Sequence, residues 1–414
     1  MAQEKDDHTH PHTKPKWTIM IFMGSAPLPN FDDLSPQAND TLSQLRRAVG
    51  GATKSERLNV FVQMHGAGTP RKYHIGYAPE DGQPVEQNEG APENELPLIT
   101  FVKWALKEAH HNDSDYSMLV LWGHAYEFAI GPRQLPTGID ALDFAELALA
   151  LEHTQTDWKR KHEGSDGKID IVGFDSCDVA TVEVAWQISR YAHYFLASQM
   201  SVPLPGWPYE QIVMGLNDSY ARHVPMDPQD LGAFVIRRYC RTYSRQDRPV
   251  SLTLINLEKA PDVFRAAQFL AIQLVLATGT SSDELALIHS LFYRSQTWEA
   301  KPFVDVADLC LNLWRYSEHE GVVNAAAQLG DLLIRPTGPT EDAKTPEALR
   351  TVQPFVVEHG RNMHSTARLQ GISLYAPNVV DGLNWQDASY AYQKFLFAQH
   401  TKWGRLVEAL AQPG

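Results

Sequence analysis

Short apolar runs alternate with amphipathic stretches in the first half of the chain. Runs rich in β-branched and aromatic residues are typical of strands buried in a parallel sheet, and they occur at Trp17–Met23, Leu58–Met64, Tyr116–Ala125, Lys168–Cys177 and Tyr194–Ser198. Between them, apolar residues at helical spacing predict helices at Thr41–Val49, Leu96–His110, Asp143–Leu151 and Thr181–Tyr191. This alternation predicts right-handed crossovers and a mostly parallel sheet with helices on both faces.

The second half of the chain is predicted to be mainly helical. Helical spacing recurs at Asp230–Tyr243, Ala260–Ala277, Ser282–Tyr293 and Val304–Tyr316. Other segments are predicted to be a short hairpin arm at Tyr73–Tyr77, a polar connection at Thr154–Gly167, two further strands of the sheet at Ser251–Leu257 and Gly371–Tyr375, and a flexible loop at Arg335–Thr345.

Length and composition fit a large α/β protein. A chain of 414 residues buries enough surface for its core to need no disulfide or metal, and its three scattered cysteines favour a reducing compartment. The balance of 36 basic against 50 acidic residues argues against nucleic-acid binding. Residues 1–16 lack the apolar core of a secretory signal, and polar residues interrupt Val263–Ala277, which predicts a core helix rather than a membrane span. We therefore expect a cytoplasmic protein without a membrane partner.

Two of the predicted strands end in residues capable of covalent chemistry. Ligands bind beyond the carboxyl ends of parallel strands, and both His124 and Cys177 lie at such an end. They are 177 − 124 = 53 residues apart, close to the spacing of about 50 residues between the histidine and cysteine of caspases. Polar neighbours and the positive end of a following helix favour a Cys177 thiolate. A small buried residue that closes the strand is the alternative.

The other cysteines and histidines fit structural roles better. Cys240 and Cys310 lie beside apolar residues in amphipathic helices and are predicted to be core. Among the 17 histidines, His65 and His359 also precede glycines, but neither follows a strand placed one crossover before Cys177. His124 does, and it follows Gly123, where the missing side chain lets the backbone approach a ligand closely.

Several motifs around this pair match a known family. They are Trp122–His124, Gly173–Cys177, Val182–Ala185, Ala197–Ser198 and Gly206–Tyr209, with further similarity at Trp17–Met23, Arg71–Ile75 and Gly371–Pro377. The chain thus resembles the clostripain-like cysteine peptidases, family C11 of the clan of caspases, gingipains and legumain. The resemblance implies a caspase-like three-layer α/β/α sandwich with a mostly parallel central sheet at 17–258. A disordered polar tail at 1–16 would precede it, and a mainly helical C-terminal region at 259–414, packed on the same sheet, would follow.

The resemblance also implies a mechanism. Cys177 would attack the scissile carbonyl and form a thioester, while His124 would protonate the leaving amine and then assist water. Backbone N–H groups of Gly123, Ala125 and Cys177 would stabilise the oxyanion. We expect a protein or peptide substrate and no cofactor; modulation by calcium stays open, although no calcium-loop spacing is found. A catalytically silent or latent caspase-like regulatory or binding protein is the alternative.

Two departures from the family pattern bear on the site. Ala125 stands where the family usually has glycine, and Pro205 stands where relatives that cut after Arg or Lys commonly have aspartate. Asp175 and Cys177 should point the same way along an extended strand, so Asp175 is a candidate acidic residue of the S1 pocket for a basic P1 residue. A structural carboxylate is the alternative. Trp207 and Tyr209 are candidate walls of the substrate cleft, or packing residues.

The basic stretch Trp158–Lys168 lies between His124 and Cys177 in sequence. It is a candidate site of self-cleavage, and a solvated connector is the favoured alternative; activation by a partner protein stays open. A thiol hydrolase of the α/β-hydrolase type is disfavoured. The segment around Cys177 lacks the glycine spacing of a nucleophile elbow, and the histidine precedes the nucleophile instead of following it.

Overall fold

The computed structural model describes residues 17–26, 33–50, 58–66, 70–75, 84–85, 96–110, 114–126, 129–135, 138–297, 302–333, 354–362, 369–376 and 392–411. The predicted N-terminal tail and the predicted loop at Arg335–Thr345 lie outside these residues.

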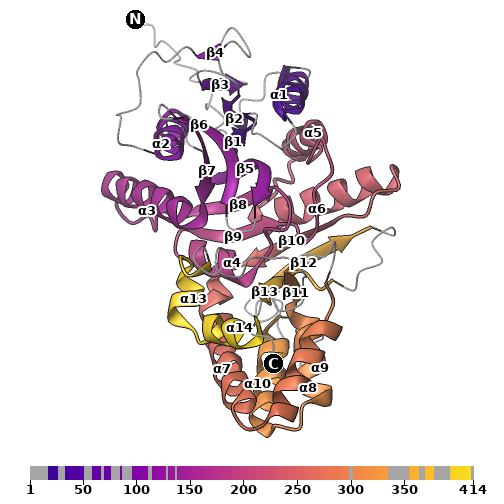
Figure 1. Ribbon diagram of the computed structural model, residues 1–414. Coiled ribbons are helices and arrows are strands. Elements are labelled where there is room, and N and C mark those ends of the chain that lie inside the picture. Colours follow the sequence, from indigo (N-terminus) through magenta and orange to yellow (C-terminus); the bar gives the residue numbers. More distant parts are fainter. Residues whose placement is uncertain are drawn as a thin grey trace, which may run out of the picture.

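A mixed sheet with a parallel centre forms the middle of the molecule (Figure 1). Its strand order is β12-β10-β9-β8-β5-β1-β2-β3-β4. The strands from β9 to β2 run parallel, and β10, β12 and β3 join the two sides antiparallel. The strands are β1 (Trp17–Gly24), β2 (Leu58–His65), β3 (Arg71–Ile75), β4 (Pro84–Val85), β5 (Tyr116–Tyr126), β8 (Ile169–Asp175), β9 (Ala192–Ala197), β10 (Ser251–Asn256) and β12 (Val356–Arg361).

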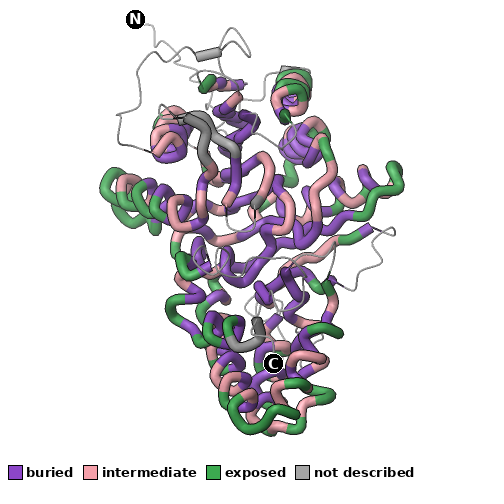
Figure 2. Tube along the Cα trace, viewed as in Figure 1, coloured by how far each residue is buried: buried purple, intermediate pink, exposed green. Residues whose placement is uncertain are grey.

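Helices cover both faces of this sheet. One face carries α1 (Ser35–Gly50), α5 (Tyr209–Ala221) and α6 (Pro228–Ser244), and the other carries α2 (Pro97–His110), α3 (Phe144–Lys161) and α4 (Val182–Ile188). Successive side chains of a strand point to opposite faces, so Ile19 and Ile21 belong to one core while Met20 and Phe22 belong to the other. The sheet between them is buried (Figure 2). The predicted three-layer α/β/α architecture is confirmed.

The C-terminal region is mainly helical and lies beyond the β10 side of the sheet (Figure 1). Its first long helix, α7, packs against α4 and so joins this region to the sandwich. The elements are η1 (Leu257–Lys259), α7 (Ala260–Thr278), α8 (Ser282–Arg294), β11 (Phe303–Asp305), α9 (Val306–Tyr316), α10 (Glu320–Leu333), β13 (Ser373–Tyr375), α13 (Leu396–His400) and α14 (Trp403–Ala411).

Several segments differ from the sequence-based prediction. The predicted sheet strand at Gly371–Tyr375 instead forms β13, which pairs with β11 in a separate two-stranded sheet. The edge strand β12 and the hairpin of β6 (Ala129–Leu135) and β7 (Gly138–Asp143) were not predicted. Helix α3 continues to Lys161, into the stretch predicted to be a polar connection. A capping box at Asp143 and Glu146 starts this helix, and the pair of Lys161 with Asp157 (2.6 Å) supports its last turns.

The segment Leu257–Thr278 is long and apolar enough to cross a membrane by length and composition alone. Within it, α7 turns one apolar face, which includes Val263, Leu270 and Leu274, into the core. The face packs against α4, α10 and α14. This is the arrangement expected of a core helix, as the sequence predicts.

Candidate active site

His124 and Cys177 are brought to the same edge of the sheet by two neighbouring parallel strands. Strand β5 pairs with β8 at a constant offset, from Met118 with Ile171 to Trp122 with Asp175. This offset equals the separation of the two candidates, since 171 − 118 = 177 − 124 = 53. Strand β8 ends at Asp175, two residues before Cys177, and the same offset relates Cys177 to His124 in β5. Both candidates therefore lie at the same edge of the sheet.

A side-chain hydrogen bond holds the strands together just before the pair. Ser176 Oγ donates to the carbonyl oxygen of Gly123 at 2.8 Å. Ser176 is buried, while His124 and Cys177 are half-buried. The bond joins the residues that immediately precede the imidazole and the thiol, so it restricts how far one can move relative to the other.

The Cys177 thiol contacts the segment that follows β9. The N–H of Val202 donates to Cys177 Sγ at 3.2 Å, and the N–H of Asp178 donates to Met200 O at 3.2 Å. Helix α4 begins only at Val182, with Thr181 as its N-cap. The effect of a helix dipole is confined to its first turn, so the predicted help from the helix N-terminus at Cys177 is replaced here by the Val202 amide.

The backbone at Gly123 lies in close contact with two other backbone segments. It has φ +148°, and a Cβ placed on it would lie 2.6 Å from Gly24 O and 2.9 Å from Gly131 O. These oxygens belong to β1 and β6, which follow one another along the same side of β5, opposite the side that pairs with β8. Only glycine fits this position without displacing a strand.

Ala125 lies in the extended part of β5, opposite Ile130 of β6. Among the described non-glycine residues, only Asp178, His223 and Asp247 have a positive φ. Ala125 therefore needs no glycine-like conformation, and the departure from the family pattern at this position carries no backbone strain. Gly123 and Ala125 flank His124, and Cys177 is itself a candidate catalytic residue. The role of their backbone N–H groups as oxyanion donors stays a prediction.

The structure turns Asp175 toward the protein interior. Its Oδ2 accepts hydrogen bonds from the N–H of Trp207 (2.9 Å) and the hydroxyl of Tyr209 (2.8 Å). The three side chains are 1–3% exposed. This geometry fits the two alternatives that the sequence left open: Asp175 as a structural carboxylate, and Trp207 and Tyr209 as packing residues. It does not fit a free acidic S1 residue or aromatic cleft walls.

A comparison with protein families assigns the chain to a family. The model of the clostripain family, peptidase family C11, matches residues 37–408. The chain belongs to the clostripain family of cysteine peptidases. The match spans every strand of the sheet except β1, both candidate residues and most of the helical region. The resemblance inferred from the motifs is thereby confirmed.

Solved structures share the fold of this clostripain-family chain. An inactive zymogen of a C11 protease from Parabacteroides distasonis has 13% identity and a TM-score of 0.59, over 94% of this chain and 98% of that one. A secreted C11 cysteine protease from Bacteroides thetaiotaomicron, in complex with an irreversible peptide inhibitor, has 14% identity and a TM-score of 0.58, over 94% and 99%. At these identities the likeness shows the fold alone. None of the curated proteins matches the chain.

A buried polar network ties the site of this clostripain-family chain to its C-terminal region. Gln199 is fully buried; its Nε2 donates to Asp305 Oδ2 (3.0 Å) and Ser373 Oγ (2.9 Å), and its Oε1 accepts from Gly371 N (2.7 Å). The N–H of Ser373 in turn donates to Ala180 O at 2.9 Å. The loop that carries Cys177 is thus held between the segment after β9 and β13. Gln199 could not be predicted from the sequence, because its partners are far away along the chain.

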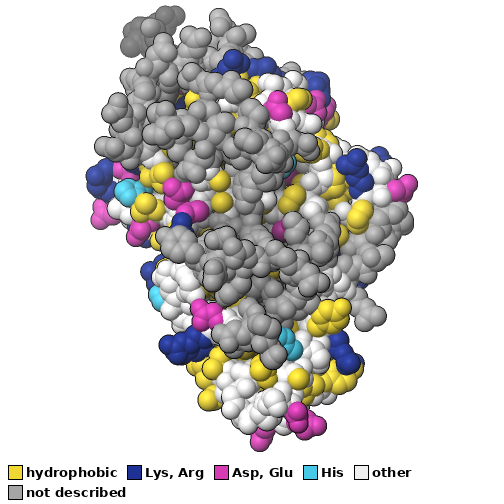
Figure 3. Space-filling view, in the orientation of Figure 1, with side chains coloured by type: hydrophobic (Ala, Val, Ile, Leu, Met, Phe, Trp, Pro, Cys, Tyr) yellow, Lys and Arg dark blue, Asp and Glu magenta, His cyan; other side chains and the backbone are white. Residues whose placement is uncertain are grey.

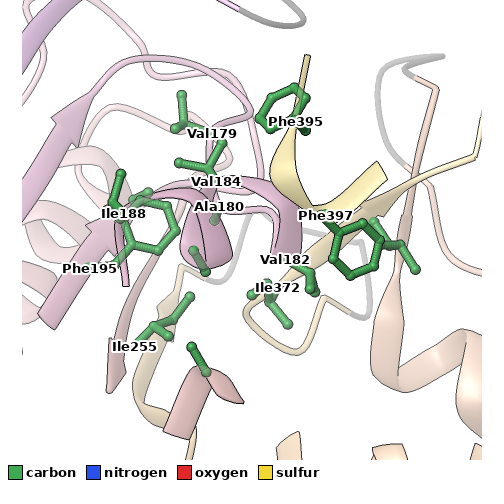
Figure 4. Packing of buried hydrophobic residues seen from close by; sticks show 14 of the residues in the cluster. Val179, Ala180, Val182, Val184, Ile188, Phe195, Ile255, Ile372, Phe395 and Phe397 are labelled. Atoms are coloured by element: carbon green, nitrogen blue, oxygen red, sulfur yellow. The ribbon is translucent and has the colours of Figure 1, made fainter. Parts of the chain in front are cut away.

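Apolar packing and a buried carboxyl group reinforce the same connection. In Figure 4, Ile372, Phe395 and Phe397 from the C-terminal region lie around Val182 and Val184 of α4. Glu183, on the same helix, accepts hydrogen bonds from Tyr375 N and Tyr392 Oη, both at 3.0 Å. Burial raises the pKa of Glu183 to about 7. The C-terminal region therefore helps to hold the loop that carries Cys177 in place.

A groove between α9 and α10 lies apart from this site. It is lined by residues that include Ala307, Leu311, Trp314 and Gly330. Apolar side chains are visible over this helical region in the lower part of Figure 3. None of the residues predicted for catalysis or substrate binding lines the groove, so it plays no part in the proposed reaction.

Ionisation of Asp175 should make the protein less stable as the pH rises. Burial raises the pKa of Asp175 from 3.8 to about 7, so between these values the folded state holds a proton that the unfolded state has released. The free energy of unfolding, compared with that of Asp175→Asn, should fall by on the order of 1–3 kcal/mol between pH 4 and pH 7. The comparison with Asp175→Asn is needed because other groups also titrate in this range. Burial lowers the pKa of His74 and His359 to about 4, so these histidines make the folded protein more stable as the pH rises.

Urea unfolding of the two proteins at several pH values checks this prediction. Asparagine keeps an acceptor oxygen for Trp207 and Tyr209, so the fold should survive. The exposed Asp218 in α5, replaced in the same way, should leave the pH dependence unchanged. A wild-type profile parallel to that of Asp175→Asn would show that Asp175 keeps an ordinary pKa.

Proposed function

We propose that this chain is a cysteine endopeptidase that acts through His124 and Cys177. The observation that supports the proposal is the offset of 53 residues between β5 and β8, which equals the separation of His124 and Cys177 and brings both residues to the same edge of the sheet. His124 takes the thiol proton, and the thiolate attacks the carbonyl carbon of the scissile peptide. The C–N bond then breaks and His124 returns the proton to the leaving amine. Water, deprotonated by His124, hydrolyses the thioester, which releases the acid and restores the thiol.

Backbone amides around the pair are proposed to stabilise the tetrahedral intermediates. Gly123 and Ala125 flank His124 in β5, and the N–H of Cys177 is the third candidate donor. Fixed amide dipoles aimed at the developing oxyanion are often the largest contribution to catalysis. We propose that the reaction needs no metal or cofactor, because thiol, imidazole and amides supply each step. A cytoplasmic location likewise stays a proposal.

Covalent labelling tests the proposed dyad. A peptide acyloxymethyl ketone should modify Cys177 alone, and peptide mapping by mass spectrometry locates the adduct. His124→Ala should slow the labelling by about 100-fold, because the thiolate loses its base. Labelling at Cys240 or Cys310, or equal rates in His124→Ala, would count against the dyad.

A latent state is the second candidate, and one contact favours it. The Val202 amide already occupies the Cys177 sulfur at 3.2 Å, and the thiol is only half exposed. If the protein is latent, the acyloxymethyl ketone should fail to react although iodoacetamide still alkylates Cys177. Reaction with both reagents identifies an active peptidase.

Self-cleavage in the basic stretch Trp158–Lys168 is not part of the proposal. Residues up to Lys161 belong to α3, and Lys168 pairs with Glu258 at 2.6 Å. The connection also precedes β8, whereas Cys177 follows it, so they lie at opposite ends of a strand that is roughly 23 Å long at 3.3 Å per residue. The solvated connector, favoured by the sequence, fits this position.

We therefore expect the chain to stay intact in this stretch. Wild-type protein, incubated under conditions that allow complete probe labelling, should show no fragment that ends between residues 158 and 168. Gel electrophoresis and intact-mass measurement check this result. A cut that depends on Cys177 and proceeds at a rate independent of dilution would contradict it, since such a cut is intramolecular.

A further inference from the structure

An exposed apolar turn lies directly beside the nucleophile. Val202, whose N–H contacts Cys177 Sγ, is followed by a turn that the N–H of Gly206 closes by donating to Pro203 O at 2.9 Å. Leu204 is at most about 7.6 Å from Val202, since consecutive Cα atoms are 3.8 Å apart. The side chain of Leu204 is 39% exposed, and Pro203 and Pro205 are half-buried.

Hydrogen bonds to the buried Tyr243 hold this turn in place. Tyr243 of α6 is fully buried, and its Oη lies 2.8 Å from Pro203 O and 2.7 Å from Gly206 O. It also accepts a hydrogen bond from Gly206 N at 3.2 Å. An apolar side chain held at the surface by a buried anchor is preorganised for contact with a ligand, because little entropy is lost on binding.

The acidic side chain nearest to this anchor is closed off. Gly206 covers the Asp175 carboxylate so tightly that an added Cβ would lie 2.5 Å from Oδ2. Trp207 and Tyr209 both donate to Oδ2 of the same carboxylate, and Oδ1 is buried as well. A lysine or arginine side chain of a substrate cannot reach Asp175 unless this cluster opens, and a buried cation without a partner is costly.

We propose that the turn Pro203–Gly206 forms one wall of the S1 subsite, and that this subsite takes an apolar P1 side chain rather than arginine or lysine. The inference rests on the proposed function, because it concerns the peptide bound to the same thiol. Burial of an apolar P1 side chain against Val202 and Leu204 contributes roughly 25 cal/mol per Å². The mechanism is unchanged; the inference names the class of peptide that the enzyme cleaves.

A P1 series of peptide substrates tests the inference. At about 0.15 M salt, which screens the attraction of a chain with net charge −14 for basic peptides, kcat/KM for P1 leucine, methionine or phenylalanine should exceed that for arginine or lysine at least 10-fold. Leu204→Asp should lower this ratio about 10-fold or more. Leu149→Asp, a matched change at an exposed leucine of α3, should leave it unchanged.

Two further arms separate the explanations. Asp178→Asn should not alter the ratio, although Asp178 follows the nucleophile, and iodoacetamide labelling of Cys177 should confirm that each variant keeps its thiol accessible. A wild-type preference for arginine or lysine, or a ratio that changes in Asp178→Asn but not in Leu204→Asp, would overturn the inference and leave the peptidase standing. Absence of cleavage with every P1 residue would remove both proposals.

Discussion

Replacement of Cys177 with alanine should abolish peptide cleavage while the fold persists. Removal of a nucleophile from a catalytic unit typically costs a factor of about 10⁴ to 10⁶ in kcat, because neither the imidazole nor the amides can form the acyl intermediate. The thiol is half-buried, and its hydrogen-bond contacts with the backbone of Val202 are weak ones to sulfur. Its loss should therefore cost only about 1 kcal/mol of stability.

Cys240→Ala provides the matched control. This cysteine is also half-buried, but it lies on α6 and burial raises its pKa to about 12. It is protonated at neutral pH, so its replacement should change kcat/KM less than about 2-fold. Steady-state assays and thermal unfolding of both variants check the prediction. Turnover above background in Cys177→Ala would mean that another group performs the attack.

The sequence predicted the part of the site that depends on local pattern. Short apolar runs rich in β-branched residues are typical of strands buried in a parallel sheet, and parallel strands deliver their last residues to one edge. The positions of His124 and Cys177 follow from these two facts alone. Their register was not predicted: the separation of 53 residues was compared only with the spacing found in caspases, and its equality with the offset between β5 and β8 is a finding of the structure.

The surroundings of the pair could not be predicted, because they depend on contacts between distant residues. Asp175 is buried by Trp207 and Tyr209, which lie 32 and 34 residues away, and Gln199 bonds to Asp305 over 106 residues. An acidic residue two positions before a cysteine has the same local pattern whether it faces a pocket or the core. The β6–β7 hairpin was missed for a similar reason, since pairing with β5 rather than its own apolar pattern defines it.

The compressed backbone at Gly123 gives the second large effect expected of this site. Gly123→Ala should lower kcat/KM at least about 100-fold, because the added Cβ would meet two backbone oxygens that cannot rotate away. The end of β5 must then shift against β1 or β6, and His124 shifts with it. A displacement of about 1 Å in a reacting group can cost a factor of 100. The strain should also lower the free energy of unfolding by about 1–3 kcal/mol.

Gly164→Ala is the control for Gly123→Ala. It tests whether replacing a glycine of positive φ is enough to lower activity when the glycine lies away from His124 and Cys177. Gly164 also has a positive φ, +83°, but no atom lies within 4 Å of its added Cβ, and it belongs to the connection before β8. This variant should lose about 1 kcal/mol of stability and keep its activity. In Gly123→Ala, iodoacetamide should still alkylate Cys177, which would show that the thiol stays present and accessible while activity is lost. A Gly123→Ala enzyme that keeps more than half of the wild-type kcat/KM would show that β5 can move without displacing His124, and the close spacing of imidazole and thiol would then not limit the reaction.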